Sequence, residues 1–332
     1  MKSSSALLSQ ALILYTLIPS STAAVISPAS QLFQSQSNLS LPDHASNDDV
    51  RFELRGHYGD ENLNIIALLM NTIDGLANLA HQPCYKRIPG FHVEILPWYA
   101  DIDISIQPAR PARDIEVQIA VNALYYAVYN MIANKVFKNA EFDIFWDGNI
   151  VGQILIEKAT GPSRTVSEVF NASQTTTEPS TPLSNQTVAT NLTANSGEGL
   201  RLFFHYRPHG EKMSFQEVFV TLMAALKNLG RWPSSQVVEP FRTGARGCNA
   251  RMQFYGDETP RTEPPFLTYA LLVDSVRQFP FYMVDHKRFA ELQAVVVCDG
   301  EVVGEVFLER GSPELGGVGG CGGGSSCDLS SS

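Results

Sequence analysis

Two aspartates near residue 100 are the carboxylates whose spacing could support catalysis or metal binding. Asp101 and Asp103 lie two residues apart in a segment that alternates polar and apolar residues, so on a strand both would face the same side. Such a pair can transfer protons or bind a cation. A similar segment later in the chain has Asn249 and Arg251 in their place. We therefore interpret the aspartates as part of a solvated strand surface, with a catalytic or cation site as the alternative.

Two histidines recur in a similar context. His57-Tyr58 and His205-Tyr206 each close a strand-like segment. Imidazoles at equivalent strand ends could exchange protons near neutral pH. The helices that follow align at a different spacing, so the match between the two pairs requires a gap in the alignment. We interpret both histidines as polar residues at strand ends. His205 and His209 could both reach a metal ion, but two ligands without a third make a weak site, so we predict neither a metal nor another cofactor.

Aromatic residues in predicted loops are the best candidates for ligand binding. Trp98 and Tyr99 follow a proline, and Trp232 lies just past a predicted helix end. Such side chains can stack on sugar rings or anchor a protein partner. The alternative is that they cap the hydrophobic core or fill a contact between domains.

Sequence motifs of the common enzyme classes are absent from the chain. It has no Gly-x-Ser-x-Gly, no His-Glu-x-x-His, no phosphate-binding loop and no Cys-x-x-Cys. This absence favours a non-catalytic protein that binds an extracellular carbohydrate or protein ligand. A secreted hydrolase or isomerase without a local motif is the alternative, and His57, His205, Asp101 and Asp103 would then be the residues to test. A purely structural role is a third hypothesis.

The beginning of the chain has the pattern of a secretory signal peptide over residues 1–24, with Lys2, an apolar run and small residues up to Ala24. We therefore expect a secreted, extracellular protein. Four Asn-x-Ser/Thr sequons agree with this route, and they predict glycans at Asn38, Asn171, Asn185 and Asn191. A formal net charge of −10 argues against nucleic acid or an anionic membrane as a partner.

The chain has five cysteines, and secretion favours disulfide bonds. Cys248 precedes a predicted strand and Cys298 ends another, so a bond between them would form easily if those strands are neighbours. Cys321 and Cys327 could close a small loop, which would leave Cys84 without a partner. Other pairings fit the sequence as well.

An internal duplication organises the chain, because residues 51–158 and 201–310 contain the same order of predicted elements. The closest match is a hairpin near the end of each copy, which turns at Asp147-Gly148 and at Asp299-Gly300; Asp-Gly is among the strongest turn signals. Outside the two modules we expect a flexible extension over 25–50, a Ser/Thr-rich glycosylated linker over 159–200 and a disordered Gly/Ser tail over 311–332.

Apolar residues spaced three and four apart predict the first helix of each module. They are Ile65, Leu68, Leu69, Ile73, Leu76 and Leu79 in the first copy, and Phe215, Val218, Phe219, Leu222, Leu226 and Leu229 in the second. Asp114 is predicted to cap the second helix of the first module. The corresponding helix of the second module should begin at Pro264-Pro265 and end near Pro280.

Each predicted helix has a single apolar stripe to bury, so both helices of a module should cover one face of its sheet. The sequence thus predicts an α+β fold of two tandem homologous modules, each a mainly antiparallel sheet with two helices on one face. One arrangement that fits is ferredoxin-like with an added hairpin strand. Tyr125, Tyr126 and Tyr129 widen the apolar face of one helix, which indicates that the two modules pack on each other.

Overall fold

A computed structural model describes residues 51–93, 97–110, 113–159, 188–191, 199–245, 247–256 and 263–311, with the backbone alone for Trp98 and for 188–191. All of them belong to one compact unit, Ser35–Ser332. The predicted signal peptide, N-terminal extension and Gly/Ser tail lie outside these residues, apart from Gly311. The sequons at Asn38, Asn171 and Asn185 also lie outside them, as does the side chain of Asn191.

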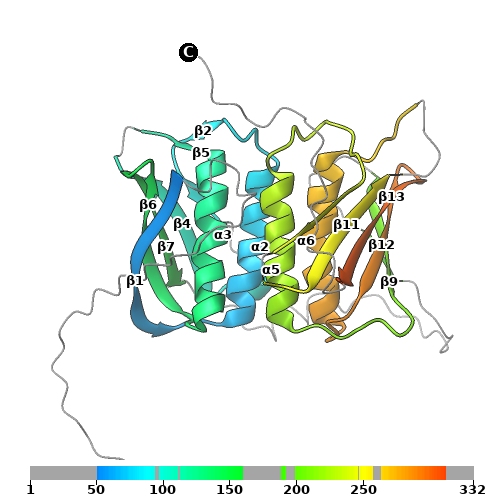
Figure 1. Ribbon diagram of the computed structural model, residues 1–332, viewed down its shortest axis with the longest axis horizontal. Coiled ribbons are helices and arrows are strands. Elements are labelled where there is room, and N and C mark those ends of the chain that lie inside the picture. The colour runs from blue at the N-terminus through cyan, green and yellow to red at the C-terminus, as the bar shows by residue number, and fades with distance from the viewer. Residues whose placement is uncertain are drawn as a thin grey trace, which may run out of the picture. The chain divides into compact units, whose positions relative to one another are not determined.

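The first module contains a five-stranded sheet, two long helices and a small two-stranded sheet (Figure 1). Its elements in chain order are β1 (Phe52–Asn62), α2 (Ile65–Ala80), β2 (Arg87–Ile88), β3 (Phe91–His92), the 3-10 helix η1 (Pro97–Tyr99), β4 (Ile102–Pro108), β5 (Ile115–Glu116), α3 (Val117–Asn134), β6 (Lys138–Trp146) and β7 (Asn149–Lys158).

The second module repeats the two long helices and the main strands of this series around a six-stranded sheet. Its elements are β8 (Val188–Asn191), β9 (Arg201–Tyr206), α5 (Phe215–Leu229), β10 (Phe241–Gly244), β11 (Ala250–Gly256), α6 (Tyr269–Asp285), β12 (Leu292–Cys298) and β13 (Glu301–Arg310). Strand β8 comes from the segment predicted to be a structureless linker, and it adds to the sheet by pairing with β9.

The strand order confirms the predicted fold class. The first sheet has the order β1-β6-β7-β4-β3, and the second has the equivalent order β9-β12-β13-β11-β10 with β8 added beside β9. All pairings are antiparallel. The ferredoxin-like alternative does not describe this order, because there the first strand lies inside the sheet, whereas β1 lies at an edge and β7 of the hairpin takes the central place.

The hairpins are the same in both copies in detail. Asp147 and Gly148 have φ of 50° and 75°, and Asp299 and Gly300 have φ of 52° and 86°. Positive φ at both central residues is the type I′ turn that suits the twist of a two-residue hairpin. A β-bulge follows at equivalent places, where the register shifts after Ile144 in β6 and after Val296 in β12. The predicted match between the two turns is therefore confirmed.

Helix starts follow the side chains that can satisfy free backbone N–H groups. Asn64 accepts hydrogen bonds from the N–H groups of Ile66 and Ala67, and Ser214 accepts one from Glu217, as its Ser-x-x-Glu pattern indicates. The cap predicted at Asp114 is wrong, because Ile115 is buried and pairs with Ile88, which keeps the chain extended until α3 begins at Val117.

Helix α6 also differs from prediction at both ends. It begins at Tyr269 after Thr268, whose hydroxyl accepts a hydrogen bond from the N–H of Leu271, and it continues through Pro280 to Asp285. An interior proline costs about 3 kcal/mol. Burial of Phe279, Tyr282 and Met283 in the same turns contributes about 1.5–3 kcal/mol each, which outweighs that cost.

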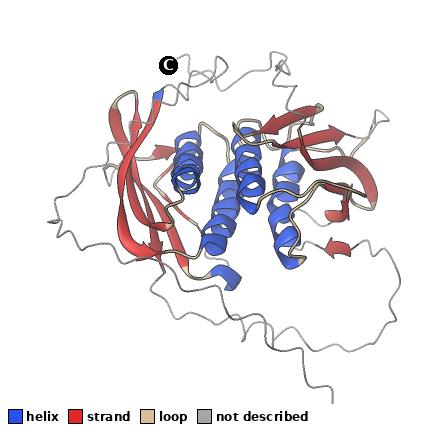
Figure 2. Cartoon of the chain, turned by 60° about the horizontal axis from the view of Figure 1, so that its bottom comes forward, coloured by secondary structure: helices blue, strands red, loops and turns tan. Residues whose placement is uncertain are grey.

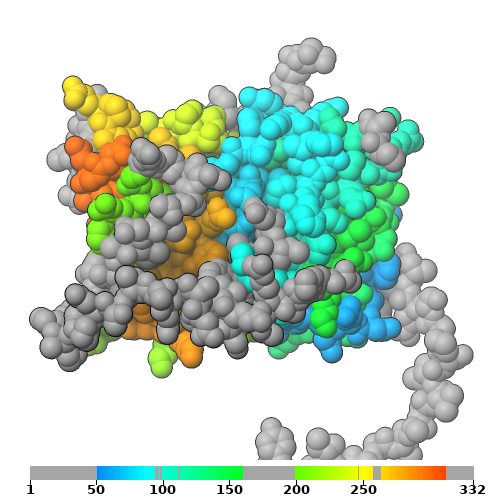
Figure 3. Space-filling view, turned by 180° about the vertical axis from the view of Figure 1, so that it is seen from behind, coloured from blue at the N-terminus to red at the C-terminus, as the bar shows by residue number. Residues whose placement is uncertain are grey.

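The four α-helices of the described residues lie between the two sheets, so the modules face each other through their helical layers (Figures 1 and 2). Helices α2 and α5 approach closely where Ala80 meets Gly230, since a Cβ on Gly230 would lie 3.1 Å from the Ala80 Cα. These two residues occupy equivalent places at the ends of equivalent helices. Contact between equivalent residues is the mark of an approximate two-fold axis. Figure 3 shows the residues of the two modules meeting along one boundary.

The predicted packing of the modules is thus confirmed, and the tyrosines take part in it. The Lys227 ammonium of α5 donates a hydrogen bond of 2.9 Å to the Tyr126 hydroxyl of α3, and it lies 5.1 Å from the centre of the Tyr125 ring. None of the helices in the described part of the chain is long and apolar enough to cross a membrane.

Candidate functional site

The two histidines singled out from the sequence are structurally equivalent. His57 on β1 pairs with Glu141, and His205 on β9 pairs with Gln293, at the same place in the two sheets. The difference in spacing comes from the loop before the first helix of each module, which is longer in the second. Both side chains are exposed. They lie in different sheets, so the structure does not combine them into one site.

The two aspartates lie far from those histidines. Asp103 is on β4, and β6 and β7 separate it from His57 on β1, which places the strands roughly 14 Å apart. Its nearest basic neighbour is His92, whose Nδ1 lies 3.3 Å from Asp103 Oδ1 on the sheet surface. The carbonyl of Asp101 accepts a hydrogen bond from the N–H of Ala159. The four residues named for an enzyme therefore do not converge.

The loop aromatics make contacts within the fold. Trp232 stacks on Tyr269 with ring centres 5.4 Å apart and packs against the core. Tyr99 lies 6.5 Å from the Phe281 ring of the other module, and burial raises the pKa of its hydroxyl. These contacts use part of each ring surface. The side chain of Trp98 lies outside the described residues.

The predicted disulfide between Cys248 and Cys298 is not formed, and both thiols are free. The two cysteines lie at opposite ends of β13, because Ala250 pairs with Arg310 whereas Cys298 pairs with Glu301. That separation is roughly 30 Å along the strand, far beyond the reach of a disulfide. Cys84, which the sequence left without a partner, is disulfide-bonded.

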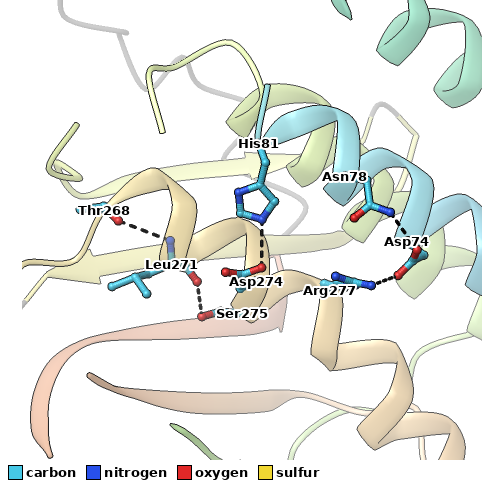
Figure 4. A network of polar contacts seen from close by, with 8 residues as sticks. All are labelled: Asp74, Asn78, His81, Thr268, Leu271, Asp274, Ser275 and Arg277. Carbon is cyan, nitrogen blue, oxygen red and sulfur yellow. Dashed lines mark hydrogen bonds and ion pairs between the residues drawn. The ribbon is translucent and has the colours of Figure 1, made fainter. Parts of the chain in front are cut away.

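A polar network between α2 and α6 brings a histidine and a carboxylate together across the module boundary (Figure 4). His81 Nε2 lies 2.9 Å from Asp274 Oδ1, and the Asp274 side chain is only 8% exposed. About two turns earlier on α2, Asp74 forms an ion pair with Arg277 and accepts a hydrogen bond of 3.0 Å from Asn78.

This network could hold a proton but lacks the other parts of a hydrolytic site. No described hydroxyl or thiol forms a hydrogen bond with His81, and Ser275 donates its own to the Leu271 carbonyl. Within the described ranges, no group of three His, Cys, Asp or Glu side chains could hold a metal ion. The geometry is that of a buried polar contact between two helices.

A groove of about 810 Å³ opens on the face of the second sheet that points away from the helices. We call it the β11–β13 groove. Its lining includes Arg207, Gln253, Tyr255, Glu305, Phe307 and Glu309. These strand residues alternate with Met252, Phe254, Val306 and Leu308, which are fully buried on the helix side. The alternation of the two strands thus builds the core on one face and the groove on the other.

The groove combines an aromatic corner with polar groups. The rings of Tyr255 and Phe307 meet edge to face with centres 5.6 Å apart. Gln253 is 6% exposed and accepts a hydrogen bond from the Tyr255 hydroxyl. Glu305 lies beside this corner, because it pairs directly with Tyr255 across the strands. Aromatic surface with a few fixed polar groups is the usual composition of a small-ligand site.

The first module has different residues at the same positions. Gln107 pairs with Gln153 where Tyr255 pairs with Glu305, and Ser105 pairs with Leu155 where Gln253 pairs with Phe307. Gln153 is held by a hydrogen bond to Glu141. The aromatic corner and its carboxylate are therefore specific to the second copy.

Sequence reasoning did not identify Tyr255, Glu305 and Phe307. A signal was available, since they occupy outward positions of alternating strands and differ in type from their counterparts in the first copy. Comparison of the chain with models of protein families, with curated proteins and with solved structures finds no match.

Proposed function

We propose that this chain is a secreted glycoprotein without catalytic activity that binds an extracellular ligand in the β11–β13 groove. The observation that carries the proposal is the difference between the copies: one backbone, used twice, presents Tyr255, Glu305 and Phe307 in the second module and Gln107, Gln153 and Leu155 in the first. The two modules share the same turns and the same pattern of buried strand residues. The substitutions at these three positions therefore alter a solvent-facing surface.

Of the two ligand classes considered from the sequence, a carbohydrate suits this groove better than a protein. Its volume, about 810 Å³, falls within the range of small-molecule sites. Rings such as Tyr255 and Phe307 offer apolar surface to a sugar, and Gln253 and Glu305 offer hydrogen-bonding groups for hydroxyls. A protein partner would require a larger apolar patch around the groove.

The test is a glycan-binding screen of the protein produced in a secretory host, followed by calorimetry with the glycans that bind. Replacement of groove residues by their first-module counterparts, Tyr255→Gln and Phe307→Leu, should weaken binding about five- to thirtyfold each, because loss of one ring removes about 1–2 kcal/mol of stacking and burial.

The duplicated sheet supplies the matched control. Leu155→Ala removes an apolar side chain from the corresponding place in the first module and should leave glycan affinity unchanged. A screen without any bound glycan, or Tyr255→Gln and Phe307→Leu variants that bind as well as the parent, would contradict the proposal.

The secreted-enzyme alternative is favoured by one observation, the 2.9 Å contact between His81 and Asp274. That contact is between two helices, and the described residues place no nucleophile on it. Binding without catalysis therefore remains the better-supported function.

A further inference from the structure

We propose that the β11–β13 groove recognises an amine-bearing sugar and that Glu305 binds its protonated amino group. This inference rests on the proposed function, since it specifies the ligand of the same groove. Recognition of an amine depends on the charged side chains that line the groove and on whether each already has a partner of opposite charge within the protein.

The positive charge in the lining is neutralised by neighbouring carboxylates. The Arg207 guanidinium donates a hydrogen bond of 3.3 Å to Glu309, and it lies 3.9 Å from a carboxylate oxygen of Glu291. It also lies over the Phe307 ring, 5.7 Å from the ring centre. Two carboxylates and an aromatic face thus hold Arg207, which makes it a poor partner for an anionic ligand.

Glu305 has no such partner among the described residues. Its direct neighbours across the strands are Tyr255 on one side and Val295 on the other, neither of them basic. The Tyr255 hydroxyl donates to Gln253 and not to Glu305. The side chain is half-buried. A half-buried carboxylate beside apolar groups gains more from a cation than a fully solvated one does.

The aromatic corner makes the site suitable for a cation that is attached to a ring. An ammonium beside Tyr255 and Phe307 gains from their negative ring faces, while the ring that carries it covers their apolar surface. The formal net charge of −10 also favours the approach of cations over anions. A sugar with a free amino group combines these features in one ligand.

The experiment compares two oligosaccharides that differ in one respect, a tetramer of glucosamine and its fully N-acetylated counterpart, at about pH 5.5, where amino groups of this kind are protonated. Calorimetry with the parent protein should show at least tenfold tighter binding of the glucosamine tetramer, because a hydrogen bond to a charged group contributes about that factor. Added salt should reduce the preference.

Glu305→Gln keeps the shape of the side chain and removes its charge, so it should bring the two affinities to within about twofold. Glu157→Gln makes the same change in net charge on the first sheet and should keep the parent's preference. Thermal unfolding of both variants, expected to match the parent, shows that any loss of preference is not a loss of folding.

The outcomes separate the two proposals. Equal affinity of the parent for both tetramers, with a dependence on Phe307 retained, would overturn amine recognition and leave carbohydrate binding in place. Tighter binding of tetralysine than of the glucosamine tetramer would overturn the sugar assignment. Absence of binding to either tetramer and to every glycan of the screen would overturn the proposed function itself.

Discussion

Phe307 replaces a leucine of the first copy, and Tyr255 replaces a glutamine, at strand positions whose backbone pairing is the same in both sheets. At the residue scale, the function proposed for this chain depends on such substitutions. Alternation along a strand leaves outward residues free to change, because they contribute little to the core. Sequence patterns identified the inward residues well, whereas the only sequence signal for these outward residues is that they differ from their counterparts in the first copy.

The cysteines allow a direct check at the same scale. Burial raises the pKa of the Cys248 thiol, aided by the nearby Glu217 carboxylate, and burial together with the Asp299 carboxylate raises that of Cys298. Both should be alkylated without prior reduction, but at about pH 8 more slowly than a free cysteine, because the thiolate is the reactive form. Peptide mass spectrometry with and without reductant measures this. Labelling of either residue only after reduction would show that it is disulfide-bonded.

The site was only partly predictable from sequence for a physical reason. Tryptophans at loop ends are typical both of ligand sites and of core edges, and the stacking of Trp232 on Tyr269 depends on contacts between distant segments. The disulfide between Cys248 and Cys298 was wrong for the same kind of reason. It required knowledge of strand order, and β13 enters the sheet between β11 and β12.

At the scale of elements, local rules determined much of the fold. The helix stripes and the Asp-Gly turns are short-range signals, and the structure confirms both of them. The predictions at Asp114 and Pro280 were wrong because burial outweighed local preference. Ile115 pairs in a strand before α3 can start, and the apolar residues around Pro280 hold α6 together past the proline.

The hairpin turns yield a prediction that uses both copies. Gly148 and Gly300 have positive φ and open space where a Cβ would stand, so Gly148→Ala and Gly300→Ala should each lower the free energy of unfolding by about 1 kcal/mol through backbone strain alone. Asparagine tolerates this conformation better, so Gly148→Asn and Gly300→Asn should restore most of the loss. Urea unfolding measures all four variants. Alanine variants as stable as the parent would show that strain at these turns is negligible.

At the scale of the whole molecule, the two modules are joined by a buried polar network as well as by apolar helices. The Asp74 side chain is 2% exposed and is paired with Arg277 of the other module. Loss of Arg277 leaves the buried Asp74 carboxylate without that cation, which costs more than loss of both members of the ion pair.

Arg277→Met should therefore lower the free energy of unfolding by about 3 kcal/mol, and the double variant with Asp74→Leu should recover most of that loss. The exposed pair of Arg55 and Glu53 provides the control, since Arg55→Met should lower the free energy of unfolding far less than Arg277→Met does. Urea unfolding of the three variants tests the comparison. A double variant no more stable than Arg277→Met would show that loss of the cation beside the buried Asp74 carboxylate is not the cause.

The approximate two-fold contact at Ala80 and Gly230 has a consequence for how the chain assembles. The surface that the first module presents to the second is present on every copy of the chain. Only the covalent connection through residues 160–187 therefore favours pairing of the modules within one molecule over pairing between two molecules. That connection sets the effective concentration at which each module meets its own partner. A connection too short to span the two modules would make exchange between chains the easier outcome, and the same interface would then assemble reciprocal dimers instead of monomers.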